Sequence, residues 1–324
     1  MGWYSAVGRR AFFALPPETA HRLAGKLLSL PLPWARIGGA LEDPSLAVTL
    51  AGIPLRNPVG LAAGFDKTGA HVQALGSLGF GYVVAGTFTL EPRHGNPHPR
   101  IARFLRQRSM VNSMGLPNPG AESAAVDLAD RSPLLPVFVS IADQSLDAAL
   151  ATLDLLAPHA DAIELNASCP NVEWGRDGDD EVHLAELVTA LAARARCPLF
   201  VKLPPFLTDA AREGVLALAR VAQDAGAAGI TCSNTHPVAT DRLASGTGGL
   251  SGRALWPHTP KIVAAIVEAT GGTLPVNACG GIFTSKDVRE CLDAGATTVQ
   301  IYTAFIYEGP GIVGALTRGL RASL

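Results

Sequence analysis

Short, continuous apolar segments recur along the chain from residue 58 onward, and segments with helical spacing of apolar residues separate most of them. We expect strands at residues 59–62, 82–86, 137–141, 162–165, 199–203, 229–232, 274–278 and 298–302. Helices are expected at residues 183–195, 210–225, 260–269 and 286–294. Continuous apolar strands that alternate with helices are typical of a parallel sheet covered by helices.

The number of these units selects one architecture. Eight strands over about 250 residues predict an α/β protein with a (β/α)8 TIM barrel rather than a doubly wound sheet. We assign residues 41–324 to this barrel. The stretch between the second and third strands, residues 90–136, is too long for one helix and must hold further structure.

Residues 1–40 form a separate N-terminal helical extension in this prediction. Apolar side chains at Ala20, Leu23, Leu27 and Leu28 fall on one side of a helix, and prolines follow it. The first 36 residues carry five basic side chains and one acidic one. A pair of apolar, basic helices suits a membrane surface, whereas an ordinary helix packed on the barrel explains the same pattern equally well.

Composition and charge narrow the class of protein. Hydrophobic residues make up 48% and charged residues 17%, which supports a large core and argues against disorder. A net charge of −2 gives no indication of nucleic-acid binding. The five cysteines are scattered and form no CxxC pair, which fits a reducing cytosol and argues against a disulfide framework or a metal site. No apolar run reaches the roughly 18 residues that span a bilayer. We therefore expect a cytoplasmic protein, with peripheral contact at the inner face of the cell membrane left open.

Polar residues and glycines gather where the predicted strands end. In a barrel of parallel strands, active sites form at the carboxyl ends. Seven strand ends carry such groups: Gly64 and Lys67, Thr87, Asn166 to Asn171, Lys202, Ser233 with Asn234 and Thr235, Cys279 with Gly280 and Gly281, and Tyr302 with Thr303. We expect these groups to converge on one site.

The loops after the last two strands indicate a phosphate site. In barrels these loops commonly hold an anion on backbone N–H groups and a helix N-terminus. Gly280 and Gly281 follow strand seven, and residues 248–252 of the preceding connection add further glycines. A Gly-Gly pair alone usually marks a turn, but this position favours a phosphate.

Two lysines stand at the expected mouth of the barrel. Lys202 lies inside an apolar strand, where it can pair with a carboxylate, face an electron-rich cofactor such as a flavin, or form a Schiff base. Lys67 follows the first strand, where it can pair with Asp66 on the surface or hold a substrate carboxylate.

Amides and one thiol complete the candidate chemistry. Asn112, Asn166, Asn171 and Asn234 supply donors and acceptors that suit a planar heterocycle. The loop at residues 112–120 contains apolar residues and is expected to act as a lid. Cys169 precedes a Pro-Asn turn at a strand end, where a thiolate can remove a carbon-bound proton. The four other cysteines are expected to be structural.

The chain resembles the dihydroorotate dehydrogenases, the flavin enzymes of pyrimidine biosynthesis. The resemblance runs from about residue 3 to the C-terminus and rests on motifs in the family's order at residues 57–67, 112–116, 166–171, 248–252 and 300–303. It implies a dehydrogenase that oxidises dihydroorotate to orotate, with Cys169 removing the C5 proton and the C6 hydride passing to flavin N5.

The resemblance also implies the ligand contacts. The cofactor would be FMN, held by Ala63, Gly64, Thr87, Asn112, Asn166, Lys202, Ser233, Ser251, Gly252, Gly280, Gly281, Tyr302 and Thr303. Dihydroorotate or orotate would be held by Lys67, Asn112, Ser113, Met114, Gly115, Leu116, Asn166, Asn171, Asn234 and Thr235. No metal is implied.

The motifs combine two subclasses of this family. The N-terminal segment and residues 95–100 resemble the membrane-associated class that reduces quinone, and that class normally uses a serine base. The motif around Cys169 resembles the soluble class, whose base is cysteine. We expect quinone as electron acceptor, with fumarate or NAD as alternatives. Other interpretations are a flavin enzyme for another dihydropyrimidine, a Schiff-base lyase, and a non-catalytic flavin-binding barrel.

Overall fold

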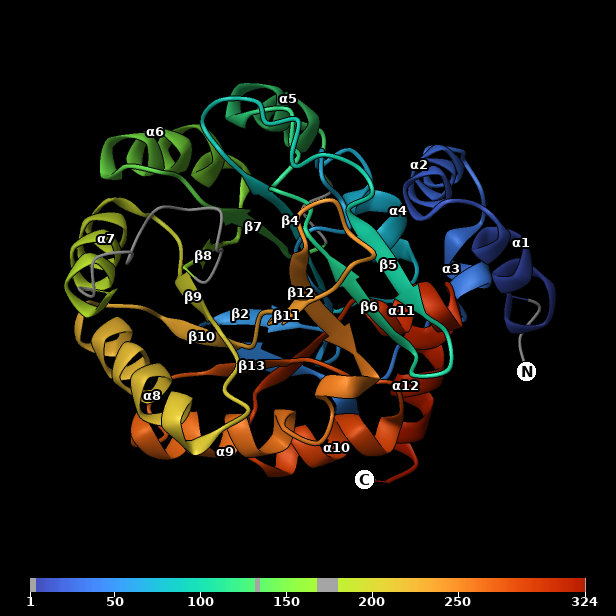
Figure 1. Ribbon diagram of the computed structural model, residues 1–324. Coiled ribbons are helices and arrows are strands. Elements are labelled where there is room, and N and C mark those ends of the chain that lie inside the picture. Colours follow the sequence, from blue (N-terminus) through green and yellow to red (C-terminus); the bar gives the residue numbers. More distant parts are fainter. Residues whose placement is uncertain (1–3, 132–134, 168–179, 324) are drawn as a thin grey trace.

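The computed structural model describes residues 4–131, 135–167 and 180–323 (Figure 1). Eight parallel strands close into a barrel in chain order, and the last strand pairs with the first. These strands are β3 (Val59–Leu61), β4 (Tyr82–Phe88), β7 (Val137–Ile141), β8 (Ala162–Asn166), β9 (Leu199–Leu203), β10 (Gly229–Cys232), β13 (Val276–Cys279) and β14 (Thr298–Ile301). The TIM-barrel prediction is confirmed, and every predicted strand lies within two residues of an observed one.

Helices surround the barrel (Figure 1). They are α4 (Val72–Ser77), α5 (Ala121–Ala129), α6 (Leu146–Leu156), α7 (Asp180–Arg194), α8 (Asp209–Asp224), α9 (Thr259–Ala269), α10 (Ser285–Asp293), α11 (Thr303–Glu308) and α12 (Ile312–Arg321). Thr208 caps α8, and Thr284 forms a capping box with Asp287 at the start of α10. The four predicted helices are confirmed as α7 to α10.

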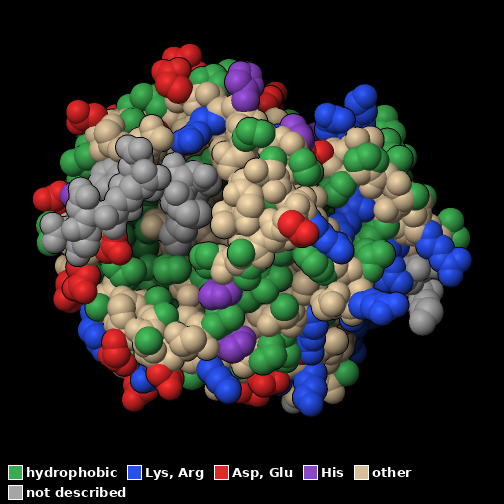
Figure 2. Space-filling view, in the orientation of Figure 1, with side chains coloured by type: hydrophobic (Ala, Val, Ile, Leu, Met, Phe, Trp, Pro, Cys, Tyr) green, Lys and Arg blue, Asp and Glu red, His purple; other side chains and the backbone are tan. Residues whose placement is uncertain are grey.

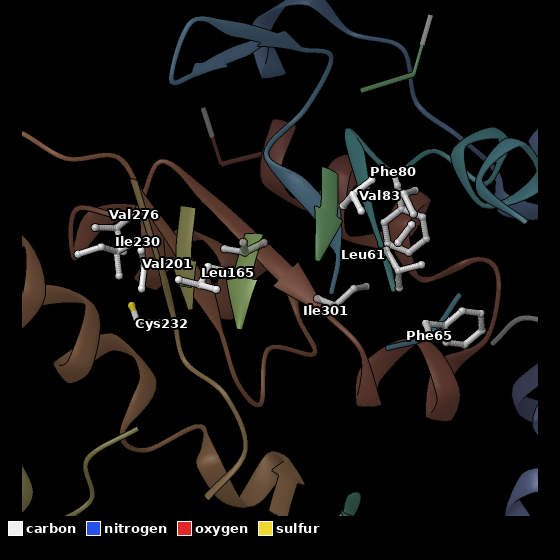
Figure 3. Close-up of a cluster of buried hydrophobic side chains, with 14 of the residues drawn as sticks. Leu61, Phe65, Phe80, Val83, Leu165, Val201, Ile230, Cys232, Val276 and Ile301 are labelled. Atoms are coloured by element: carbon white, nitrogen blue, oxygen red, sulfur yellow. The ribbon is translucent and has the colours of Figure 1, made fainter. Parts of the chain in front are cut away.

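Alternate residues of each strand point to opposite sides of the barrel wall. One set, including Leu61, Val83, Leu165, Val201 and Ile230, belongs to the main hydrophobic cluster with the surrounding helices (Figure 3). The alternation therefore leaves the other set, at positions such as 82, 138, 164, 200 and 202, for the interior of the barrel.

Aromatic rings fill the amino-terminal end of the interior. The rings of Tyr82 and Phe138 lie 4.7 Å apart, and those of Phe138 and Phe200 lie 5.4 Å apart. A hairpin of β1 (Val48–Leu50) and β2 (Ile53–Leu55) packs Leu50 and Leu55 against this cluster. One end of the barrel is thus closed by hydrocarbon, which leaves the carboxyl end for chemistry.

A small antiparallel sheet covers part of the carboxyl end (Figure 1). Its strands are β5 (Ile101–Phe104), β6 (Ser109–Asn112), β11 (His236–Ala239) and β12 (Thr247–Gly252), in the order β11-β12-β6-β5. The expectation of further structure in residues 90–136 is confirmed, since β5, β6 and α5 all lie there. The sheet itself was not predicted.

The N-terminal segment packs on the side of the barrel through α1 (Arg9–Ala14), α2 (Pro17–Leu28) and α3 (Trp34–Gly38). A π-helical turn, Tyr4–Gly8, precedes them, and the Tyr4 hydroxyl donates to the Ile306 carbonyl at 2.9 Å. The Glu18 carboxylate forms a two-point ion pair with Arg100, at 2.9 and 3.0 Å, which fastens α2 to the end of the β5 region. Among the described residues, none of the helices has the length and apolar character needed to cross a membrane.

Candidate active site

The carboxyl ends of the barrel strands and the covering sheet line a cavity of about 840 Å³. This volume is in the range of pockets that bind cofactors and small ligands. The predicted site residues that line it are Ala63, Gly64, Lys67, Thr87, Asn112, Ser113, Met114, Gly115, Leu116, Asn166, Lys202, Ser233, Asn234, Thr235, Ser251, Gly252, Gly280, Gly281, Tyr302 and Thr303. The other two predicted residues, Cys169 and Asn171, lie outside the described part of the chain.

Lys67 forms one side of this cavity. Its Nζ donates to the Gly64 carbonyl at 2.7 Å and lies 3.5 Å from Nε2 of His21, on α2. Burial lowers the pKa of Lys67 to about 8, although the charge of Glu18 opposes this shift. Burial, together with the charge of Lys67, lowers the pKa of His21 to about 3, so the imidazole is neutral at physiological pH.

The alternative of a surface ion pair between Asp66 and Lys67 is wrong. The Asp66 carboxylate is buried and accepts hydrogen bonds from the backbone N–H groups of Thr68, Gly69 and His71. These bonds fold the chain after β3 into a tight turn. The turn holds Lys67 beside the cavity and leaves its ammonium group for another anion.

Lys202 forms another side, from inside β9. Its side chain is only 7% exposed and its Nζ lies 3.4 Å from Oε1 of Glu164, which is fully buried on β8. Burial lowers the pKa of Lys202, but the charge of Glu164 and the hydrogen bond to its carboxylate outweigh burial and raise the pKa above its ordinary value. The sequence-based interpretation that paired Lys202 with a carboxylate is confirmed, and Lys202 also lines the cavity.

Amide and hydroxyl groups form a connected cluster between the strands. The Asn234 amide donates to Oδ1 of Asn166 at 3.0 Å, and the Asn166 amide lies 3.5 Å from the Thr87 hydroxyl. Thr87 in turn pairs with the Ser140 hydroxyl at 2.9 Å. The Asn234 side chain also accepts from the Thr235 N–H at 2.8 Å. This network fixes the orientation of polar side chains that line the cavity.

The loop that follows β6 lies over the cavity mouth. Asn112 ends β6, and its amide lies 3.5 Å from the Gly249 carbonyl of β12. The Asn96 amide donates to the Ser113 carbonyl at 3.0 Å, and the Asn96 N–H donates to the Met114 carbonyl at 2.9 Å. The Ser113 hydroxyl is buried and has no hydrogen-bond partner among the described residues. A buried, unsatisfied hydroxyl in a cavity wall suits a ligand contact.

Glycines line the part of the cavity near β13 and β14. Gly252, Gly280 and Gly281 have φ of 89°, 139° and 71°, which favour glycine. A Cβ at Gly281 would approach a backbone nitrogen to 2.6 Å, so the space allows no side chain. The hydroxyls of Ser251 and Thr303 lie 3.0 Å apart in the same wall. Bare backbone and paired hydroxyls of this kind suit a phosphate group.

Sequence reasoning missed two polar groups here, Gln300 and Glu164. Gln300 and Cys279 line the cavity, and Glu164 lies behind Lys202. A charged residue inside an apolar strand identified Lys202, and the same signal was present at Glu164. Cys279 is among the strand-end groups that the sequence places at the site, although its thiol is expected to be structural.

These features define a β/α-barrel enzyme with a polar cavity at the carboxyl ends of its strands. The family model of dihydroorotate dehydrogenase matches residues 45–324. A relative from Leifsonia xyli subsp. xyli named dihydroorotate dehydrogenase (quinone) is 42% identical over 94% of this chain and 95% of its own. One of the same name from Erythrobacter litoralis is 40% identical over 98% and 94%. The chain belongs to the dihydroorotate dehydrogenase family of flavin enzymes and is an oxidoreductase.

Solved structures agree with this assignment. The ligand-free enzyme of Eimeria tenella superposes with a TM-score of 0.81 and 29% identity, over 94% of each chain. The same enzyme in complex with ferulenol gives a TM-score of 0.80 and 30% identity, over 94% of this chain and 90% of that one.

Proposed function

We propose that this protein oxidises dihydroorotate to orotate in pyrimidine biosynthesis, with FMN as its flavin. The observation that carries the proposal is one cavity with a lysine on each of two sides and an amide cluster between the strands. Lys67 can hold a carboxylate, and Lys202 can hold an electron-rich ring. The relatives' names point to the same substrate.

The residues that line the cavity fit a flavin mononucleotide. Ser251, Gly252, Gly280, Gly281 and Thr303 would hold its phosphate, because the glycines leave backbone N–H groups uncovered. The isoalloxazine ring would be held by Ala63, Gly64, Thr87, Asn112, Asn166, Lys202, Ser233 and Tyr302. When bound, the flavin supplies the acceptor for the hydride that leaves C6 of the substrate.

The substrate would be held between Lys67 and the amides. Lys67 pairs with the carboxylate, and the unpartnered Ser113 hydroxyl donates to or accepts from the pyrimidine ring. Further contacts come from Asn112, Met114, Gly115, Leu116, Asn166, Asn171, Asn234 and Thr235. Several fixed donors and acceptors around a planar ring give orientation as well as affinity.

Cys169 is the base in this proposal and takes the C5 proton on its sulfur. Cys169→Ala should slow flavin reduction by dihydroorotate by about 10²- to 10⁴-fold, the usual contribution of a general base. Cys169→Ser should retain part of the rate, and both variants should keep bound FMN. Cys197→Ser, at a half-buried thiol between α7 and the amino end of β9, is the matched control. An unchanged reductive half-reaction in Cys169→Ala would remove this residue from the role.

The proposal as a whole has a direct test. Purified protein should be yellow, retain FMN on reconstitution and oxidise dihydroorotate. A colourless protein without FMN and without this activity would contradict it. Bound FMN without turnover would favour the non-catalytic barrel, and a preferred substrate unaffected by Lys67→Ala would favour another dihydropyrimidine.

The geometry around Lys202 argues against a Schiff-base lyase. A lysine that attacks a carbonyl needs a lowered pKa, so that its neutral amine is populated. The Glu164 carboxylate does the opposite and raises the pKa of Lys202. Borohydride treatment with a carbonyl substrate should therefore leave Lys202 unmodified.

For the electron acceptor we propose quinone, reached through the N-terminal helices at the inner face of the cell membrane. Large apolar side chains are exposed there, at Val7 (69%), Leu23 (40%), Leu30 (47%) and Leu32 (41%). Lys and Arg side chains gather on the same side, around α1 and α2 (Figure 2). Apolar groups beside basic ones suit a surface of anionic lipid.

Rapid mixing of the reduced enzyme with a quinone, fumarate and NAD tests this acceptor. Fastest reoxidation by the quinone supports the proposal, and fastest reoxidation by fumarate or NAD overturns it. Binding to anionic vesicles, and its loss in Leu23→Ser with Leu30→Ser, separately tests the membrane contact.

A further inference from the structure

A carboxylate with no solvent access lies at the centre of the barrel interior. Glu164 accepts hydrogen bonds from side chains of three different strands. Thr231 donates to Oε2 at 2.8 Å, Gln300 donates to Oε2 at 3.1 Å, and Lys202 donates to Oε1 at 3.4 Å. Such a set of donors suits an ionised carboxylate, which can only accept.

Hydrogen bonds behind Thr231 continue across the barrel. Asn277 donates its amide to the Thr231 hydroxyl at 3.2 Å and accepts the Thr298 hydroxyl at 2.6 Å. Because Thr298 uses its proton there, Tyr82 must donate to Thr298 across their 3.0 Å contact. The donors therefore run in one direction, from Tyr82 toward Glu164.

The pairing has a simple electrostatic reason. A buried charge without a partner costs several kcal/mol, and such groups usually lose their charge instead. Glu164 and Lys202 together have no net charge. The hydrogen-bond donors stabilise the Glu164 carboxylate, and this carboxylate stabilises the Lys202 ammonium group, which lines the cavity.

We propose that Glu164 is a positioning residue that keeps Lys202 protonated and in place at the flavin site, and that balances its charge. This inference rests on the proposed flavin binding. The hydrogen bonds from Thr231 and Gln300 favour the ionised form of Glu164, and the Glu164 carboxylate favours the protonated form of Lys202. No contact between Glu164 and a ligand is needed.

Few other titratable groups face this pair. Cys279, on β13, faces both members, and burial raises the pKa of its thiol. Tyr82, on β4 at the amino-terminal end of the barrel interior, has a pKa above its usual range because it is buried. Lys67, which lines the same cavity and has a pKa of about 8, is present in both proteins, so its contribution cancels when a Glu164 variant is compared with wild type.

The test is the reduction potential of the FMN-loaded protein as a function of pH, in wild type and Glu164→Gln. At low pH the variant site has one more positive charge than wild type, so its potential should be higher. With its counterion gone, Lys202 should titrate below the usual lysine pKa of about 10.4, toward the values of about 5–6 known for buried lysines. The difference in potential should then shrink toward zero as pH rises.

Each other outcome overturns the inference. A difference of zero at every pH, measured from about pH 5 upward so that Lys202 is still charged in the variant, means that the Glu164 charge does not act on the flavin site. A constant difference means that Lys202 does not depend on Glu164. Glu290→Gln, an equal change of charge at an exposed position on α10, is the matched control and should follow wild type. If wild type itself holds no FMN, the proposed function has failed instead.

A measurement on the wild-type holoenzyme covers the case in which Glu164→Gln does not fold. The chain has five lysines, so their ¹⁵Nζ signals can be assigned by replacing the other four with arginine. The Lys202 signal should stay unshifted up to pH 10. A Lys202 signal that moves below pH 10 would overturn the inference.

Discussion

Two lysines line the same cavity and have opposite electrostatic surroundings. Lys67 follows the end of β3 beside a carbonyl and a neutral imidazole, and its pKa is lowered to about 8 by burial. Lys202 is held inside β9 against the carboxylate of Glu164, and its pKa is raised. Lys67 is half-buried and Lys202 is almost fully buried, yet the less buried lysine has the lowered pKa, so burial alone does not decide the outcome.

The difference lies in one counterion. Lys202 has a buried anion of its own, whereas Glu18, the anion that acts most strongly on the pKa of Lys67, is engaged by Arg100. Lys67 is therefore ready to take a negative group from a ligand, and Lys202 already has one from the protein. In the proposed enzyme, the charge of Lys67 on the substrate side changes with pH, whereas the charge of Lys202 on the flavin side stays constant.

The largest expected effect comes from breaking the Lys202 pair. Lys202→Met leaves the buried Glu164 carboxylate without its counterion, which should cost about 3–5 kcal/mol of unfolding free energy. FMN should also be lost. Denaturant unfolding of the apoproteins and absorption spectra of the purified proteins measure both effects. The double change Lys202→Met with Glu164→Leu should recover most of the stability but no FMN. A single variant as stable as wild type would contradict the comparison.

Lys67→Met should leave FMN bound but lower kcat/KM for dihydroorotate by about 10²- to 10³-fold, which corresponds to the loss of a charge pair with the carboxylate. Steady-state kinetics with the spectrum as a check on flavin content measure this effect. Lys261→Met, at an exposed position on α9, is the matched control. A normal kcat/KM in Lys67→Met would place the carboxylate elsewhere.

The pH dependence of orotate binding should separate the two lysines without any change in FMN content. Below pH 8 Lys67 is protonated and holds the carboxylate. Above pH 8 the dissociation constant should rise, approaching about tenfold per pH unit. Titration of the holoenzyme with orotate between pH 6 and 9.5 measures it. In Lys67→Met, orotate should bind weakly and its dissociation constant should not change with pH. A wild-type dissociation constant that does not change with pH would show that Lys67 does not titrate between pH 6 and 9.5.

The smallest effect is on the stability of the ligand-free protein. The folded pKa of Lys67 lies below its unfolded value, so the folded state binds the proton less well than the unfolded one. Wild type is therefore penalised below pH 8 and recovers as pH rises from 8 toward about 10.4. Lys67→Met should gain about 1–2 kcal/mol at pH 7, a figure reduced for the partial exposure of this side chain. The gain should decrease by pH 9.5, and thermal denaturation at both pH values measures it.

The barrel could be predicted from the sequence because its signals are local. Each barrel strand is a short apolar run, and its neighbour in space is the next barrel strand along the chain. The covering sheet could not be predicted in this way, because β12 pairs with β6 through contacts such as Gly252 with Ser109. The glycines and hydroxyls of β12 favour a phosphate loop, and that composition gives no signal for a strand.

The site was predictable where a polar residue ends a strand, as at Lys67, Asn166 and Asn234. It was less predictable inside the barrel. Period-two alternation places Glu164 on the same face as Asn166, and therefore toward the interior. That the partner of Lys202 is Glu164 depends on the register between β8 and β9, which aligns Asn166 with Lys202. Register follows from packing and is not visible in one strand alone.

The contact between Tyr4 and Ile306 has a consequence for synthesis of the chain. These residues are 302 positions apart, so the helices that follow Tyr4 leave the ribosome well before α11, the helix on which the Tyr4 turn docks. At about 5–20 residues per second, the ribosome needs roughly 15–60 seconds to synthesise the residues between Tyr4 and α11. Throughout that interval the leucines of these helices lack their final partners. A chaperone or a lipid surface that covers these leucines in this period would act on the nascent chain before the barrel has folded.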